Sequence, residues 1–212
     1  PFTLRLRLHS IGAHAASVRA ADAARTAEKN MKTLLGHFAR SVAQNHIEIY
    51  NEFSLQHEFG AFLRNAWRDS KVQFERNVSY FFPATNDFLK KEIDLAVFSQ
   101  DKTALHYAIE FKYPRNGQYP EQMYSFCKDI AFLEQLKRAG FGKAFFIAFA
   151  DDRLFYEGNG DGIYEYFRNG QPLTGEIHKP TGNVKESVTI AGNYTIVWVP
   201  VNGQLKHMIV EI

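Results

Sequence analysis

The chain has 212 residues, of which 45% are apolar, and a formal charge of +2. A chain of this length and composition buries a full core and forms one globular domain, with or without an appendage, which excludes a disordered protein. The mild positive charge permits a polyanionic partner without demonstrating one. The single cysteine, Cys127, excludes an internal disulfide framework and a cysteine-rich zinc site, so we expect a reducing, cytoplasmic setting. No apolar run reaches the roughly 18 residues that span a bilayer, so we expect no membrane partner.

Residues 1–50 are expected to form an N-terminal appendage. Strict alternation of leucine and arginine predicts a short strand at residues 3–8, and apolar residues at helical spacing predict an alanine-rich helix over about residues 15–43. Such a helix either packs on the main domain or pairs with a second copy of the chain. A homodimer formed through this helix is therefore one expectation.

Residues 51–212 are expected to form the main domain, with a core at about residues 54–150. The predicted helices are about 55–68, with Ser54 as the cap, about 121–139 and about 162–168. The predicted strands are 72–82, two within 92–114 that turn at about 100–102, 143–150, 187–201 and 204–212, the last two joined at Asn202-Gly203. The core order is α-β-β-β-α-β, which predicts an α/β fold: a mixed sheet flanked by helices, with a C-terminal β-hairpin added.

The two strands within residues 92–114 carry the candidate chemistry. Residues two apart on a strand point to one side, so Glu110 and Lys112 share a face, and a paired hairpin brings Asp94 beside them. Two neighbouring carboxylates repel unless a cation lies between them, and their hard oxygen atoms suit Mg²⁺ or Mn²⁺. In this geometry Lys112 orients or deprotonates a water, and the Phe111 carbonyl faces the metal. The pattern predicts metal-assisted hydrolysis of a phosphodiester.

These residues resemble a known family. Asp94 followed by Glu110-Phe111-Lys112, with Glu58 on the preceding helix, is similar to the motif of the PD-(D/E)XK nuclease superfamily, and the predicted core order is similar to its restriction-endonuclease-like fold. Ile93 stands where the motif has proline. The resemblance implies a divalent-metal-dependent nuclease that acts on nucleic acid, with DNA favoured over RNA. It implies that Asp94 and Glu110 bind the metal, that Lys112 positions the attacking water, and that Glu58 is a further acidic residue near the metal.

The helix that follows Lys112 offers Gln122 and Asp129 on one face. Some branches of the superfamily have on this helix a glutamine followed four residues later by tyrosine, whereas Gln122 is followed by Phe126. Gln122 is therefore either a group that supports the site or contacts the substrate, or a solvated helix position. Several basic residues near the site elements are expected to hold a phosphate backbone: Arg64, Arg68, Lys90, Lys91, Lys102, Arg115 and Lys128.

Two other interpretations remain open at this point. One is a non-catalytic module of the same fold, which binds nucleic acid or assembles proteins. The other is a structural oligomerisation domain in which Glu58, Asp94, Glu110 and Lys112 form a buried ion network. The sequence leaves the type of cleavage and its sequence specificity open.

Overall fold

The computed structural model describes residues 30–84, 87–115, 117–158, 160–182 and 186–212. Residues 39–212 form one compact unit, which contains the whole of the expected main domain. The strand expected at residues 3–8 and the first half of the alanine-rich helix lie outside the described residues. Helix α2 (Met31–Ala43) covers the second half of the range expected for it. None of the helices in the described part of the chain is long and apolar enough to cross a membrane.

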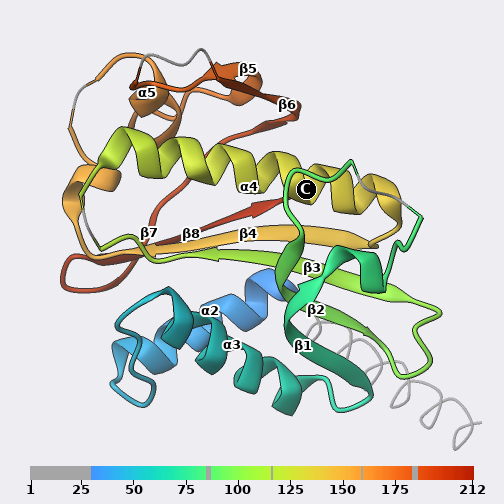
Figure 1. The fold of residues 1–212 in the computed structure, drawn as a ribbon. Helices are drawn as coiled ribbons and strands as arrows, with labels where there is room; N and C mark the ends of the chain where they lie inside the picture. Colours follow the sequence, from blue (N-terminus) through green and yellow to red (C-terminus); the bar gives the residue numbers. More distant parts are fainter. Residues whose placement is uncertain (1–29, 85–86, 116, 159, 183–185) are drawn as a thin grey trace, which may run out of the picture. The chain divides into compact units, whose positions relative to one another are not determined.

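A mixed six-stranded sheet is the centre of residues 39–212 (Figure 1). The strand order is β1-β2-β3-β4-β8-β7, in which β3 and β4 are parallel and the other neighbours are antiparallel. The strands are β1 (Ser70–Asn77), β2 (Glu92–Ser99), β3 (Leu105–Lys112), β4 (Lys143–Ala150), β7 (Val199–Asn202) and β8 (Leu205–Glu211). The predicted α/β class, with a mixed sheet and flanking helices, is confirmed.

Two helices cover opposite faces of this sheet (Figure 1). Helix α3 (Glu52–Ala66) lies against β1, β2 and β3, and its Phe59 ring meets Phe111 of β3 edge to face. Helix α4 (Tyr119–Ala139) lies against β3 and β4 on the other face. Half of the residues that the six-stranded sheet contributes to the α4 core are alanines: Ala96, Ala108, Ala144, Ala148 and Ala150. Small side chains let α4 approach the sheet closely and leave room for its aromatic residues.

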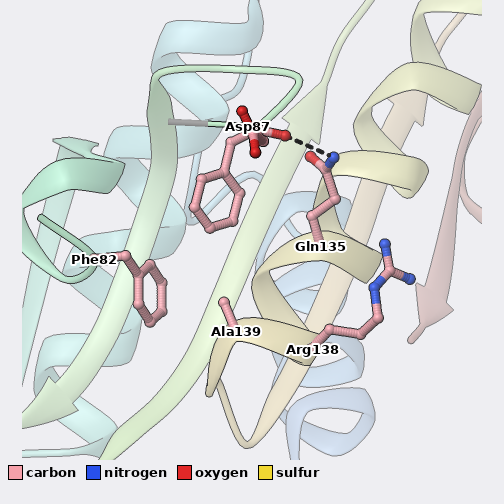
Figure 2. Close-up of a pocket in the computed structure, with 6 residues that line it drawn as sticks. Phe82, Asp87, Gln135, Arg138 and Ala139 are labelled. Carbon is pink, nitrogen blue, oxygen red and sulfur yellow. Dashed lines mark hydrogen bonds between the residues drawn. The ribbon is translucent and has the colours of Figure 1, made fainter. Parts of the chain in front are cut away.

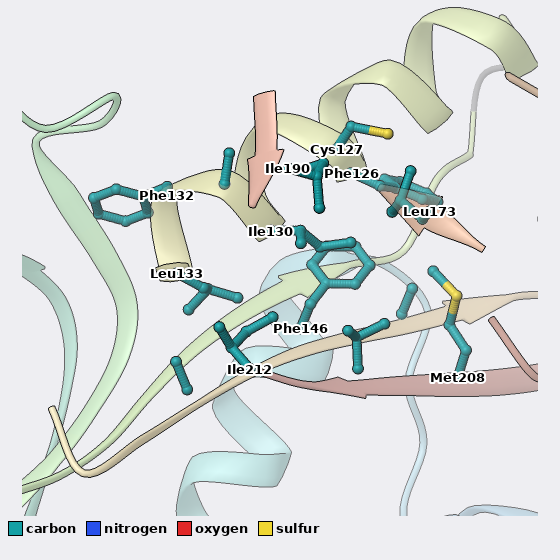
Figure 3. Packing of buried hydrophobic residues seen from close by; sticks show 14 of the residues in the cluster. Phe126, Cys127, Ile130, Phe132, Leu133, Phe146, Leu173, Ile190, Met208 and Ile212 are labelled. Carbon is teal, nitrogen blue, oxygen red and sulfur yellow. The ribbon is translucent and has the colours of Figure 1, made fainter. Parts of the chain in front are cut away.

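A two-stranded sheet packs on the outer side of α4. It consists of β5 (Leu173–His178) and β6 (Ser187–Tyr194), and Leu173 and Ile190 reach the core beside Phe126 of α4 (Figure 3). Glu134 of α4 anchors it, because its carboxylate accepts hydrogen bonds from the backbone N–H groups of Ala191 and Gly192 at 2.9 and 2.7 Å. The helix is therefore enclosed between two sheets, which explains why it is buried nearly all round.

Several element boundaries differ from the sequence prediction. Helix α3 begins at Glu52, because Asn51 is the N-cap and Ser54 closes a capping box three residues later. Strand β1 ends at Asn77, whose side chain accepts from the Ser79 N–H at 2.9 Å and starts the 3-10 turn Val78–Tyr80. The expected single strand 187–201 is wrong: β6 and β7 are separate and lie in different sheets.

Other predicted elements are confirmed. Strand β4 has the predicted bounds, and β7 and β8 form the expected hairpin at Asn202-Gly203. The short helix α5 spans Ile163–Arg168. Strand β5 and the 3-10 turn Arg153–Phe155 were not predicted.

Candidate active site

The site lies where strands β2 and β3 part. Their ladder ends at the pair Leu95 and Ile109, so Asp94 and Glu110 are the first residues beyond it. Side chains replace the lost ladder bonds: the Asp94 N–H donates to Glu110 Oε1 at 3.1 Å, and the Phe111 N–H donates to Asp94 Oδ2 at 2.8 Å. Each carboxylate is thereby fixed to the neighbouring strand, and each keeps one oxygen for another partner.

Lys90 provides that partner. It lies just before β2, and its ammonium contacts Glu110 Oε2. The same ammonium lies 3.0 Å from Asp129 Oδ1 and 3.9 Å from Asp94 Oδ1. Asp129 comes from α4, so three carboxylates from three elements meet around one cationic group.

Lys112 occupies the other side of the cluster. Its ammonium donates to the Phe111 carbonyl at 3.0 Å and lies 3.1 Å from Glu52 Oε1 and 3.2 Å from Asp129 Oδ2. Glu52 belongs to the first turn of α3, and Asp129 belongs to α4. Lys112 therefore links the two helices at the end of β3, and Asp129 connects Lys112 to Lys90.

The charges of this cluster do not balance. Four carboxylates (Glu52, Asp94, Glu110 and Asp129) face two ammonium groups (Lys90 and Lys112), so two negative charges are left over when all six groups are ionised.

The pKa shifts in this cluster arise from burial and from the neighbouring charges together. Burial raises the pKa of Asp94 to about 6 even though both lysines oppose the shift. Burial, with the charges of Asp94 and Asp129, raises the pKa of Glu110 well above its usual range. For both lysines burial alone lowers the pKa, but the surrounding carboxylates outweigh it and raise the pKa, so both remain ammonium ions at neutral pH.

A cleft of about 440 Å³ opens onto the cluster and gives it access to solvent. Its walls are formed by Glu52, Gln56, Glu75, Lys90, Lys91, Glu92, Asp94 and Lys112. Glu75 has φ +46° and falls opposite Asp94 in the register of β1 and β2, although the ladder is interrupted at that position. A non-glycine residue in this region is strained, and such strain concentrates at functional sites.

Among the residues expected from the sequence, the structure brings together Asp94, Glu110, Lys112 and the Phe111 carbonyl. It does not bring Glu58 to them: its carboxylate is partly exposed and lies 3.4 Å from His57 Nδ1. Glu52, six residues earlier, points about 120° away around the helix and reaches Lys112. Gln122 is half-buried near the start of α4 and does not line the cleft, whereas Asp129 on the same helix enters the cluster.

The donor atoms of the cluster decide whether a divalent cation fits. No group of three or more His, Cys, Asp and Glu side chains in the described ranges is arranged to hold a metal ion. Two carboxylates, Asp94 and Glu110, nevertheless converge with one oxygen each on a cation that is already present, the Lys90 ammonium. The uncompensated negative charge and the oxygen ligands suit Mg²⁺ or Mn²⁺. The residues therefore fit a metal bound by these two carboxylates.

A second, open pocket of about 350 Å³ lies beside the segment that carries Lys90 (Figure 2). It is lined by Phe82, Asp87, Phe88, Gln135, Arg138 and Ala139. Gln135 of α4 donates to the Asp87 carbonyl at 3.2 Å and accepts from the Leu89 N–H at 2.8 Å. This amide therefore clamps the backbone that leads to Lys90 onto α4.

Comparison with protein-family models, with curated proteins and with solved structures gives no match for this chain. The fold and the site define an α/β protein that has a mixed six-stranded sheet, helices on both faces and a buried cluster of carboxylates and lysines at the point where two strands part.

Proposed function

We propose that the protein is a divalent-metal-dependent nuclease with a restriction-endonuclease-like core, which hydrolyses phosphodiester bonds in DNA in the cytoplasm. One observation carries the proposal: Asp94, Glu110, Lys112 and the Phe111 carbonyl converge where β2 and β3 part, and Asp94 and Lys112 line an open cleft there. The α-β-β-β-α-β order of α3 to β4 supports the same assignment.

Asp94 and Glu110 are the residues that would hold Mg²⁺ or Mn²⁺, with the Phe111 carbonyl as a further oxygen ligand. When bound, the metal supplies a Lewis acid for the phosphate oxygens and lowers the pKa of water. The residues of the chain supply orientation. The backbone N–H groups of Asp94 and Phe111 hold the two carboxylates in place, which leaves their second oxygens directed at the cation position.

Lys112 acts as a hydrogen-bond donor in this scheme. Its carboxylate neighbours raise its pKa, so it keeps its proton and does not serve as a general base. Glu52 and Asp129 hold the ammonium from two sides at 3.1 and 3.2 Å. From this position Lys112 can donate to the attacking water or to a phosphate oxygen on which negative charge develops.

The surroundings of the cleft favour a nucleic acid substrate. Four acidic residues line it, but Lys90 and Lys91 also line it and offer positive charge to a phosphate backbone. Tyr50 and Phe53 flank the first turn of α3, beside Glu52, with exposed fractions of 61% and 72%. Aromatic side chains exposed beside a charged groove provide stacking surfaces for bases.

The test is a cleavage assay with plasmid DNA, single-stranded DNA and RNA in Mg²⁺, Mn²⁺ or EDTA. We expect wild-type protein to cut DNA only with a metal, and Asp94→Ala and Lys112→Ala to lower the rate by roughly 100-fold or more. Glu58→Ala is the matched control on α3, with activity unchanged. An intact substrate under every condition, or equal cleavage by the alanine variants, would overturn the proposal.

One observation favours a second candidate function. Lys90 and Lys112 already pair with all four carboxylates, which is the arrangement of a structural ion network. The protein would then be a non-catalytic module of the same fold, which binds nucleic acid or assembles proteins. In that case EDTA leaves binding unchanged, and substitution of Glu110 lowers stability without removing any activity.

A further inference from the structure

Lys90 and Lys112 differ in how tightly the structure holds them. The Lys112 side chain is 13% exposed and is bonded to the carbonyl of its own strand as well as to carboxylates. The Lys90 side chain is 31% exposed, lies outside any helix or strand and lines the open cleft. Lys90 is therefore the cation of the cluster that can leave it.

The Lys90 ammonium is only a partial match for the position that it occupies. It contacts Glu110 and Asp129 closely, but Asp94 Oδ1 is 3.9 Å away. A single positive charge also leaves two negative charges uncompensated in the cluster of four carboxylates and two lysines. If a divalent cation replaces this ammonium, only one negative charge is left uncompensated, because the cation carries two positive charges and the ammonium carries one.

The backbone around Lys90 does not have to move for this exchange. Gln135 holds Asp87 on α4 (Figure 2). It also accepts from the Leu89 N–H, and β2 begins at Glu92. Rotation about the bonds of the Lys90 side chain is sufficient to carry the ammonium from the carboxylates into the cleft. We propose that the Lys90 ammonium occupies the position of the catalytic cation, and that metal binding displaces it into the cleft, where it contacts a phosphate of the substrate.

This inference rests on the proposed function, because it assigns a regulatory role at the same site. Without metal, Lys90 neutralises part of the buried negative charge and stabilises the fold. With metal, the fraction of molecules in which Lys90 has withdrawn sets the apparent affinity. Lys90 thus keeps the site closed to the cation until the metal concentration is high enough, and then becomes a phosphate ligand.

The experiment measures Mn²⁺ binding by calorimetry, and thermal unfolding with and without Mn²⁺, for wild type, Lys90→Met, Lys90→Arg and Lys91→Met. Lys91 is the matched control, since it is the adjacent lysine and lines the same cleft. We expect Lys90→Met to bind Mn²⁺ at least about tenfold more tightly than wild type, because the competitor is absent. The Mn²⁺ affinities of Lys90→Arg and Lys91→Met should remain close to that of wild type. Metal-free Lys90→Met should unfold at a lower temperature than metal-free wild type, and Mn²⁺ should restore the unfolding temperature.

The outcomes separate the inference from the function on which it rests. Equal Mn²⁺ affinity in wild type and Lys90→Met overturns the role of Lys90 and leaves the nuclease proposal standing. If neither protein binds Mn²⁺ at millimolar concentration, the proposed metal site is wrong, and the proposed function fails with it. A Lys90→Met protein that stays unfolded in millimolar Mn²⁺ also counts against the inference, because the metal should then replace the missing ammonium.

Discussion

Glu110 Oε1 accepts a hydrogen bond from the backbone N–H of Asp94 at 3.1 Å, across the gap that opens between β2 and β3. In the other direction, the backbone N–H of Phe111 donates a hydrogen bond to Asp94 Oδ2 at 2.8 Å. These contacts hold two carboxylates close together in a buried place before any metal arrives. The orientation is favourable for binding a cation, and the cost is electrostatic, since the pKa of both groups is raised by burial.

Replacing Asp94 by asparagine should therefore stabilise the metal-free protein while abolishing cleavage. Because its folded pKa of about 6 lies above its ordinary value of 3.8, the ionised Asp94 lowers stability above pH 6, and this cost disappears as the pH falls below 3.8. We expect Asp94→Asn to raise the free energy of unfolding by on the order of 1–2 kcal/mol at pH 7.5 in EDTA. Urea denaturation measures it. A loss of stability of that size would contradict the account.

Glu52 and Glu58 offer a matched pair on one helix. Glu52 contacts Lys112 and lines the cleft, whereas Glu58 contacts His57. Glu52→Gln should lower the cleavage rate by about tenfold, because one of the two carboxylates that position the Lys112 ammonium loses its charge. Glu58→Gln should cleave DNA at the same rate as wild type. The opposite ranking in a rate measurement would show that the site extends along α3 toward Glu58 instead.

His207 should make the protein sensitive to acid. It is 7% exposed, its ring lies tilted against Phe149, and burial lowers its pKa from 6.5 to about 4. The unfolded chain binds a proton more readily between these values, so stability falls as the pH drops from 6.5 toward 4, by up to about 3 kcal/mol. His207→Phe removes this pH-dependent contribution to stability. The difference in unfolding free energy between wild type and variant should change with pH over that interval. A constant difference would exclude the effect.

Glu134 should matter for stability and not for chemistry. Its buried carboxylate accepts from Ala191, Gly192 and the Tyr194 hydroxyl, the last at 3.0 Å. Glu134→Ala leaves these donors without their acceptor, which should cost about 2–4 kcal/mol in urea denaturation. Glu134→Gln keeps an acceptor and should cost about half as much. Cleavage by the folded variants should persist, because Glu134 does not line the cleft. An alanine variant as stable as wild type would show that β5 and β6 are held without this anchor.

The sequence was sufficient to predict those site residues whose positions follow from alternation along a strand. Asp94 and Glu110 lie on strands with clear apolar faces, and their register follows from a short turn. Lys112 and the Phe111 carbonyl follow from the same strand. Strand β4 was equally clear, since an apolar run between glycine and aspartate predicts a buried strand.

The residues that the sequence did not assign reach the site through tertiary packing. Placing the cap of α3 at Ser54 left Glu52 outside the helix and favoured Glu58; the capping box from Asn51 to Ser54 was the pattern that could have corrected this. Lys90 reaches the cluster from a loop, and Asp129 depends on the rotation of α4 over the sheet. No local pattern determines either position. Strand β5 was missed because it pairs only with β6 and contains Gly175.

The most direct measurement is a crystal structure of the wild-type protein soaked in Mn²⁺, with anomalous scattering recorded to locate the metal. We expect an anomalous peak between Asp94 and Glu110, at about 2 Å from one oxygen of each, with the Lys90 side chain turned into the cleft. Crystals that show no peak at saturating Mn²⁺, with the Lys90 ammonium still on Glu110, would contradict the central claim that this cluster is a metal-dependent active site.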